Sequence, residues 1–249
     1  MTDPQRKMRL TPELVAQVPP YVGRPNPAQA VITYPTAVEY DAWVQGIVAG
    51  APASGDVWLF GYGSLIWNPA CAFVEERVGR VVGWRRSFCL GWTTVYRASV
   101  DRPGLMLALD RGGQCTGVVY RLPANAVAEN LDKLVRREVF GLPSPVVPRW
   151  LTAQTTGGPV RAVAFVMDRS SGLYAEGVEI NEVARALATA AGERGTMAEY
   201  LHSTVKHLEE RGIHDGHLWR LQQLVAERIE DAAAQGLWSG TLSSFNEMS

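Results

Sequence analysis

The sequence has little cysteine, no excess of charge of either sign and no long apolar run. Three cysteines among 249 residues, none of them in a C-x-x-C pair, argue against a disulfide framework and against a cysteine-built zinc site. A formal net charge of -1 gives no field that would attract nucleic acid or an anionic membrane surface. No apolar run approaches the roughly 20 residues of a membrane span. We therefore expect a protein that binds neither nucleic acid nor membranes.

The first residues also lack the apolar core of a secretory signal peptide, since residues 1–7 read MTDPQRK. Together with the odd number of cysteines, this predicts a cytoplasmic protein. Hydrophobic residues make up 47% of the chain and charged residues 20%, which is typical of a soluble globular protein with one sizeable core. The sequence does not indicate an oligomeric state.

The N-terminal stretch is rich in proline, because residues 1–35 hold seven of the 15 prolines. Proline has no backbone donor and fixes φ, so we expect an extended arm without a regular element. Thr36 and Glu39 then match a capping box, and apolar residues at helical spacing predict a helix from about Ala37 to Val48. Residues 50–55 have the composition of a linker. The expected organisation is an arm with a short helix over residues 1–55 and a compact catalytic domain over residues 56–249.

The compact domain is expected to begin with strands and to end with helices. Apolar segments punctuated by glycine or proline predict strands over residues 57–60, 78–90, 105–110, 115–121, 150–155 and 160–167. Helical patterns predict helices over about residues 124–140, 178–191, 196–211 and 214–235. Strands followed by helices favour an α+β fold over a doubly wound sheet.

Glu138 breaks the separation of apolar and charged faces in the helix predicted over residues 124–140. It follows Leu134 by four residues and Val135 by three, so it lies on the apolar face of the helix. Such a carboxylate either has a structural role, paired with an arginine such as Arg97, or lies at a helix end that frays into solvent, or, in an apolar site, has a raised pKa and serves as a general acid/base. The residues alone leave these readings open. The other charged residues are expected to face solvent: Glu129, Asp132, Lys133, Arg136 and Arg137.

The segment Gly61-Tyr62-Gly63-Ser64 directly follows the first strand of the domain. Its two glycines let the backbone turn sharply and leave amide groups open to a small anionic ligand. The segment lacks the third glycine of a dinucleotide fingerprint and does not match a nucleophile elbow. On its own it is read as a tight turn.

Four histidines lie in the last third of the chain, at positions 202, 207, 214 and 217. His214 and His217 are three residues apart and could share a helix face. They have no acidic or cysteine ligand in matching register, so we expect a polar helix end and no metal site.

The residues Val57–Pro69, VWLFGYGSLIWNP, resemble the N-terminal signature of ChaC-type γ-glutamylcyclotransferases of the glutathione-specific branch. Three later segments resemble the same family in the same order: VGWRRSF at 82–88, RRE at 136–138 and GTMAEYL at 195–201. The resemblance covers about residues 56–227. It implies the γ-glutamylcyclotransferase-like α+β fold, a small barrel-like mixed sheet flanked by helices.

The same resemblance implies roles for individual residues. Glu138 falls on the catalytic glutamate of the family, and Tyr200 on a tyrosine that lines the pocket. The expected substrate-binding residues are Leu59, Phe60, Gly61, Tyr62, Gly63, Ser64, Leu65, Arg97 and Tyr200. One departure concerns residues 96–99, which read YRAS where the family often has His-Arg-Gly-Thr. The resemblance therefore does not decide which residues line the pocket on the side of the leaving group, or which leaving group it accepts.

The implied reaction cleaves glutathione to 5-oxoproline and cysteinylglycine by intramolecular aminolysis. The substrate supplies the nucleophile, so the resemblance implies neither a cofactor nor a metal. Three alternatives stay open: a cyclotransferase for other γ-glutamyl amines or amino acids, a non-catalytic γ-glutamyl-binding module, and a hydrolase that uses Ser64.

Overall fold

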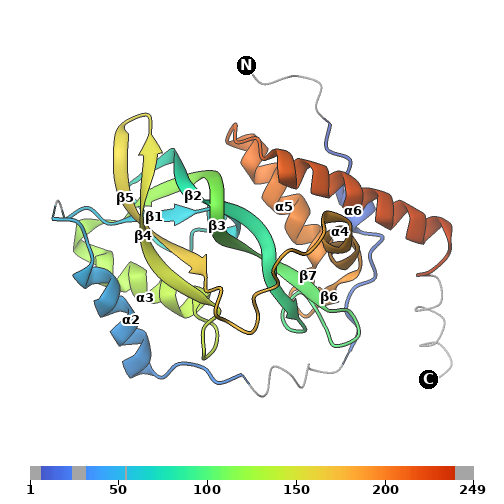
Figure 1. The fold of residues 1–249 in the computed structure, drawn as a ribbon, viewed down its shortest axis with the longest axis horizontal. Coiled ribbons are helices and arrows are strands. Elements are labelled where there is room, and N and C mark those ends of the chain that lie inside the picture. The colour runs from blue at the N-terminus through green and yellow to red at the C-terminus, as the bar shows by residue number, and fades with distance from the viewer. Residues whose placement is uncertain (1–6, 24–31, 54, 239–249) are drawn as a thin grey trace. The chain divides into compact units, whose positions relative to one another are not determined.

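The computed structural model describes residues 7–23, 32–53 and 55–238, and in it the chain divides into two compact units (Figure 1). The first, here called the barrel unit, comprises residues 32–90 and 107–174. The second, here called the helical unit, comprises the described parts of residues 1–31, 91–106 and 175–249. Each unit is described by itself below.

The barrel unit is built on a closed mixed sheet, as the resemblance to a family implies. Its strands are β1 (Trp58–Gly61), β2 (Glu75–Thr93), β3 (Gly104–Arg121), β4 (Val146–Thr155) and β5 (Gly158–Met167), in the order β1-β3-β2-β4-β5. Strand β1 pairs antiparallel with β3 and parallel with β5, and this last pairing closes the barrel. Because β1 has a partner on each side, it has no free edge, and all four of its residues are buried.

Strand β3 differs from the sequence prediction, which placed two strands over residues 105–110 and 115–121. The structure has one strand that runs through the intervening residues. Gly112 and Gly113 have φ values of 105° and 65°, which only glycine adopts without strain. These glycines lie in the gap between the two predicted strands, and the single strand continues through them.

Two helices and two short 3₁₀ turns complete the barrel unit: α2 (Ala37–Ala49), η2 (Ser64–Ile66), η3 (Ala124–Ala126) and α3 (Val127–Glu138). The capping box at the start of α2 is confirmed, because Thr36 and Glu39 each bond the backbone of the other. Helix α3 buries Leu134 and Val135, as its apolar stripe predicts, and it contacts α2 (Figure 1). The helix ends at Glu138 itself, so the predicted extension to residue 140 is wrong by two residues.

The helical unit contains the three predicted helices, α4 (Ile180–Thr189), α5 (Met197–Glu210) and α6 (Gly216–Ala234), which pack against one another. A two-stranded sheet of β6 (Ala191–Gly192) and β7 (Gly195–Thr196) separates α4 from α5 and was not predicted. Strands of two residues are too short for a periodic pattern to indicate them. Within the described residues, no helix has the length and the apolar character that a membrane span requires.

The N-terminal arm requires a correction, because it contains a short helix, α1 (Pro12–Val15). Thr11 caps this helix and Pro12 opens it, at the position where the missing proline N–H is not needed. Leu10 and Leu14 are buried, and α1 contacts α5 and α6. The count of prolines predicted an arm without any regular element and overlooked this permitted position. The domain division predicted between residues 55 and 56 stays a prediction.

A close approach of two strands gives the first testable prediction. A Cβ atom on Gly117 of β3 would collide with the carbonyl of Gly61 and the ring of Phe60 on β1. We expect Gly117→Ala to lower the free energy of unfolding by about 1–3 kcal/mol, as overpacking does. In the control Gly46→Ala, on α2, the new Cβ meets no atom within 4 Å. We expect this substitution to raise the free energy of unfolding by about 0.5–1 kcal/mol. Urea unfolding measures both, and an unchanged stability of Gly117→Ala would contradict the close approach.

Candidate active site

The turn after β1 is held in place by contacts with neighbouring elements. Gly61, Tyr62 and Gly63 lead directly into η2. The hydroxyl of Tyr120 on β3 donates to the carbonyl of Ile66, at 2.9 Å, and so fixes the end of the turn. Of the predicted substrate-binding residues here, Leu59 and Phe60 have no exposed surface and Leu65 has almost none. Their side chains belong to the core, and Tyr62 is also buried, at 7% exposure, so this segment presents mainly backbone and the half-buried Ser64.

A buried arginine orients the central peptide of this turn. Arg86 on β2 is only 6% exposed, and its Nε donates to the carbonyl of Tyr62 at 2.6 Å while Nη2 donates to the carbonyl of Thr116. The bond between Tyr62 and Gly63 is trans, since the cis peptides of the described chain lie elsewhere. In a trans peptide the carbonyl and the N–H point in opposite directions. The N–H of Gly63 therefore points away from Arg86, as a donor for an anion would.

The sequence reasoning did not single out Arg86, although a signal was present. Arg86, Phe88 and Leu90 alternate along β2 and are all buried, so Arg86 occupies an inward position of the strand. A charged residue at such a position needs several hydrogen-bond partners. The carbonyl groups of a turn and of a neighbouring strand provide them, but the alternation could not say which.

Arg137 is the second arginine at this turn, and its placement corrects the prediction that it faces solvent. Its side chain is 25% exposed. Nη2 donates to the hydroxyl of Ser64 at 2.9 Å and Nη1 donates to the carbonyl of Asn68 at 2.6 Å. Nε lies 3.3 Å from Oε1 of Glu138, in an ion pair. One guanidinium thus joins the segment after β1 to the last residue of α3.

Glu138 is enclosed, as its position on the apolar face of the helix predicts. Its side chain is 20% exposed, and burial raises the pKa of the carboxyl above the ordinary value of 4.5, against the opposing charge of Arg137. The residue also ends α3, where unpaired carbonyl groups make a negative charge unfavourable. The arrangement yields a carboxyl group that holds its proton to a higher pH than an exposed glutamate.

Arg97 and Tyr200, the two other predicted site residues, lie in the helical unit. Arg97 donates to Glu199 at 2.8 Å and lies over the ring of Tyr200, 5.7 Å from its centroid. The structural alternative for Glu138 named Arg97 as its partner, but Glu138 pairs with Arg137 and Arg97 pairs with Glu199. The substrate-binding roles of Arg97 and Tyr200 stay predictions.

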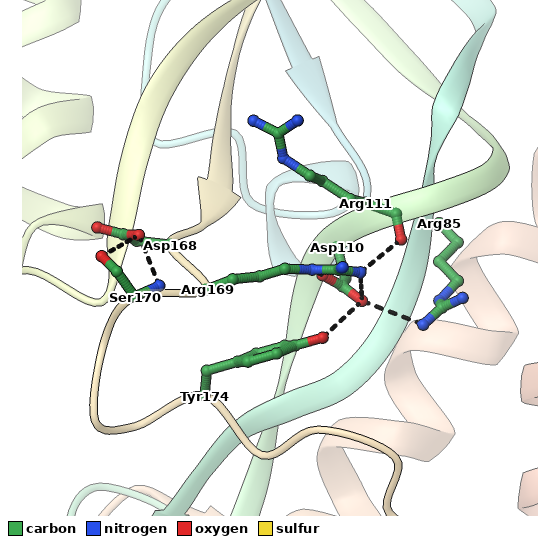
Figure 2. Close-up of polar contacts among 7 residues, drawn as sticks. All are labelled: Arg85, Asp110, Arg111, Asp168, Arg169, Ser170 and Tyr174. Atoms are coloured by element: carbon green, nitrogen blue, oxygen red, sulfur yellow. Dashed lines mark hydrogen bonds and ion pairs between the residues drawn. The ribbon is translucent and has the colours of Figure 1, made fainter.

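A second buried carboxylate, Asp110 on β3, provides a comparison with Glu138 (Figure 2). Asp110 is 1% exposed and is bound by Arg169 at 2.8 and 2.9 Å, by Arg85 at 3.2 Å and by the hydroxyl of Tyr174 at 3.4 Å. Burial alone would raise its pKa, but the hydrogen bonds and charges of Arg169 and Arg85 outweigh burial and hold the pKa below 3.8. Asp110 is therefore a structural carboxylate with several cationic and hydrogen-bonding partners, and through Arg169 and Tyr174 it holds residues 168–174 against β3.

Three further observations on the described residues concern other sites and other kinds of chemistry. A cavity of about 400 Å³ lies between α2 and strands β4 and β5, and none of the predicted site residues lines it. Among the residues that the structure describes, no group of three or more histidine, cysteine or acidic side chains lies close enough together to hold a metal ion. Burial raises the pKa of the Cys71 thiol to about 11, so this cysteine stays protonated at neutral pH and is a poor nucleophile.

The raised pKa of Glu138 predicts how stability depends on pH. In the unfolded chain this carboxyl ionises near 4.5, whereas in the folded chain it keeps its proton longer, so ionisation weakens the fold as the pH rises. We expect Glu138→Gln to be more stable than the wild type above pH 4.5, with a gain that disappears below it. Urea unfolding across this range tests the expectation. A Gln variant that is less stable at neutral pH would make Glu138 a structural ion-pair partner.

Comparison with known proteins places this chain in a family. A family model described as ChaC-like protein matches residues 57–228. The glutathione-specific gamma-glutamylcyclotransferase of Escherichia coli (strain K12) is 38% identical over 201 residues, which cover 79% of this chain and 86% of that protein. Glutathione-specific gamma-glutamylcyclotransferase 1 of Danio rerio is 28% identical over 190 residues, which cover 74% of this chain and 95% of that protein.

The fold agrees with a solved structure, that of a γ-glutamyl cyclotransferase specific to glutathione from yeast. The TM-score is 0.62 at 18% sequence identity, over 70% of this chain and 96% of that one. The family resemblance expected from the sequence is thereby confirmed: this chain belongs to the ChaC-like protein family.

Proposed function

We propose that this protein is a glutathione-specific γ-glutamylcyclotransferase, which converts glutathione into 5-oxoproline and cysteinylglycine with Glu138 as general acid/base. The observation that carries the proposal is the carboxyl group of Glu138, which is largely buried, has a raised pKa and is joined through Arg137 to the turn after β1. The relatives from E. coli and Danio rerio, which are named for this activity, support it.

The reaction is an intramolecular aminolysis. The α-amino nitrogen of the γ-glutamyl residue attacks the γ-carbonyl carbon, and the new C–N bond closes a five-membered lactam. The C–N bond to cysteinylglycine then breaks. No electrons are gained or lost overall, so the balance needs no cofactor. A substrate held in the folded conformation gains much of its rate from proximity, because effective molarities of oriented ring closures reach roughly 10⁵–10⁸ M.

Two proton transfers are left for the protein, and one carboxyl group in the right place serves both. The α-ammonium group of the substrate must lose one proton before the nitrogen can attack and a second, to solvent, as the lactam forms. The departing nitrogen must gain one proton as the old C–N bond breaks. Glu138 takes the first proton as a carboxylate and returns it to the leaving group as a carboxylic acid. A pKa above that of an exposed glutamate makes both forms accessible nearer to neutral pH, which supports this assignment.

The turn after β1 is proposed to bind the γ-glutamyl part of the substrate. Arg86 holds the carbonyl of Tyr62, so the N–H of Gly63 is directed to the opposite side, where it would donate to the substrate's α-carboxylate or to the developing oxyanion. The hydroxyl of Ser64 accepts from Arg137 and keeps its own proton for a second bond. Tyr62 is proposed as a wall of the pocket.

Covalent catalysis by Ser64 is the less favoured reading of the same turn. A nucleophilic serine needs a neighbouring base that removes its proton. The side chain that contacts Ser64 is Arg137, which is a permanent cation and cannot accept a proton. A hydrolase that uses Ser64 is therefore not supported by this contact.

A non-catalytic γ-glutamyl-binding module is the remaining alternative. It gains nothing from an enclosed, poorly compensated carboxylate, since an unpaired or half-paired buried charge lowers stability. Asp110 shows how the same barrel compensates a carboxylate fully when the role is structural. The difference between the two residues favours catalysis.

We also propose a cytoplasmic location and a small-molecule substrate. The three cysteines, Cys71, Cys89 and Cys115, are free thiols, which suits a reducing compartment rich in glutathione. The net charge of -1 gives no reason to expect a nucleic acid or an anionic membrane as a partner.

The catalytic assignment predicts the effect of two substitutions. Purified wild-type protein should release 5-oxoproline from glutathione, and Glu138→Gln should fold normally while losing on the order of 10²–10⁴ in turnover, the usual contribution of a general acid/base. Ser64→Ala should cost far less. Turnover of Glu138→Gln near that of the wild type would remove Glu138 from the mechanism, and a trapped acyl-enzyme would transfer the role to Ser64.

Substrate choice can be tested with the same assay. The specificity given in the names of the relatives predicts a higher kcat/KM for glutathione than for γ-glutamyl-alanine. The leaving group differs between the two substrates, whereas the lactam product is the same. Equal kcat/KM values for both would indicate a cyclotransferase with a broad range of γ-glutamyl donors.

A further inference from the structure

We propose that Arg137 is a positioning residue for this reaction, which ties the segment from Ser64 to Asn68 to the carboxylate of Glu138 and fixes the distance between substrate-binding turn and proton-transfer group. The inference rests on the proposed function. It assigns a role to a side chain that takes no direct part in the bond changes or proton transfers of the reaction.

The contacts of Arg137 use all three nitrogens of its guanidinium group. Nη2 donates to the hydroxyl of Ser64 at 2.9 Å, Nη1 donates to the carbonyl of Asn68 at 2.6 Å, and Nε faces Glu138 at 3.3 Å. Ser64 and Asn68 are the first and last residues of one hydrogen-bonded turn, since the N–H of Asn68 donates to the carbonyl of Ser64. The planar fork of the guanidinium spans this turn in a way that a lysine ammonium cannot.

The contact between Arg137 and Glu138 is unusual for neighbours on a helix. Side chains at successive positions point about 100° apart and do not normally meet. They meet here at the last residue of α3. The side chain of Arg137 turns inward and binds Asn68 and Ser64, which precede it in the sequence by 69 and 73 positions. A side chain that only neutralised the end of the helix would have no need of these distant partners.

Arg136, its neighbour in the sequence, shows what an arginine with a local role does on the same helix. It bonds Asp132, one turn earlier on the exposed face of α3, and lies over the ring of Tyr40 on α2. Arg136 is thus a matched control, since it has the same chemistry and helix but no contact with the turn after β1.

Two consequences for the reaction follow from the position of Arg137. Its charge opposes the effect of burial on Glu138, and so it helps to set the pH at which Glu138 accepts a proton. Its hydrogen bond occupies a lone pair of the Ser64 oxygen, so the hydroxyl proton is directed elsewhere and is free to donate to a substrate. Arg137 thereby orients a donor and adjusts a base.

The first experiment compares the pH dependence of kcat/KM for glutathione among wild type, Arg137→Met, Arg137→Lys and the control Arg136→Met. The acid limb of the profile reports ionisation of Glu138 in the free enzyme. Without the cation, Glu138 keeps its proton to higher pH, so the acid limb of Arg137→Met should move to higher pH. The maximal rate of Arg137→Met should fall on the order of 10²-fold through misplacement. Arg137→Lys should keep the limb near its wild-type position but recover only part of the rate, and Arg136→Met should match the wild type.

The outcome that overturns the proposal is a loss of rate in Arg137→Met with the acid limb unchanged, or a wild-type rate in that variant. If Arg137→Met does not fold, Arg137→Lys tests the proposal instead. This variant keeps the positive charge but lacks the planar guanidinium group, so its rate should still fall below that of the wild type. Full wild-type rate in Arg137→Lys would then contradict a role of the fork.

A second experiment does not depend on activity and so separates this inference from the proposed function. A double-mutant cycle of Arg137→Met and Glu138→Gln measures their coupling in the free energy of unfolding, from about pH 4 to about pH 9. We expect little coupling where Glu138 is protonated and a stabilising coupling once it ionises. If the wild type released no 5-oxoproline, the proposed function would fail and the cycle would still decide whether Arg137 holds Glu138. Absence of coupling at every pH would refute the inference that Arg137 holds Glu138.

Discussion

The ion pair between Glu138 and Arg137 is the interaction on which the candidate site depends. Burial and the end of helix α3 both disfavour a charge on Glu138, and Arg137 opposes them only in part. A carboxyl group in this balance holds its proton to a higher pH than an exposed or a fully paired one. Asp110, which is saturated by Arg169 and Arg85, shows the opposite solution in the same barrel.

The barrel gives this pair a fixed frame. Strand β1 is paired on both sides, and the close approach of Gly117 to Gly61 holds the start of the turn against β3. Arg86 of β2 then fixes the Tyr62 carbonyl, and Arg137 of α3 fixes the Ser64 hydroxyl. Two arginines thus hold one short segment from two elements. The direction of the Gly63 N–H follows from backbone geometry and needs no side chain of its own.

Local patterns in the sequence predicted what depends on neighbours a few residues away. The capping box at Thr36 and the apolar stripe of α3 are of this kind, and helical phase alone identified Glu138 as misplaced for a solvent-facing glutamate. The same phase placed Arg137 in solvent, because its partners lie about 70 residues away and leave no periodic trace. The helix at Pro12 was missed because counting prolines ignores the one helical position that tolerates them. The barrel and the reaction came from the resemblance to a family and not from periodicity.

The central claim, that Glu138 is held as a carboxyl group with a raised proton affinity, is tested most directly by NMR. Wild-type protein labelled with ¹³C at the glutamate δ-carbons would be titrated, with Glu138→Gln identifying the resonance. The account predicts that the Glu138 carboxyl titrates above the ordinary value of 4.5 in the free protein. A midpoint at or below 4.5 would contradict it, because Glu138 would then be an ordinary ionised carboxylate stabilised by its arginine.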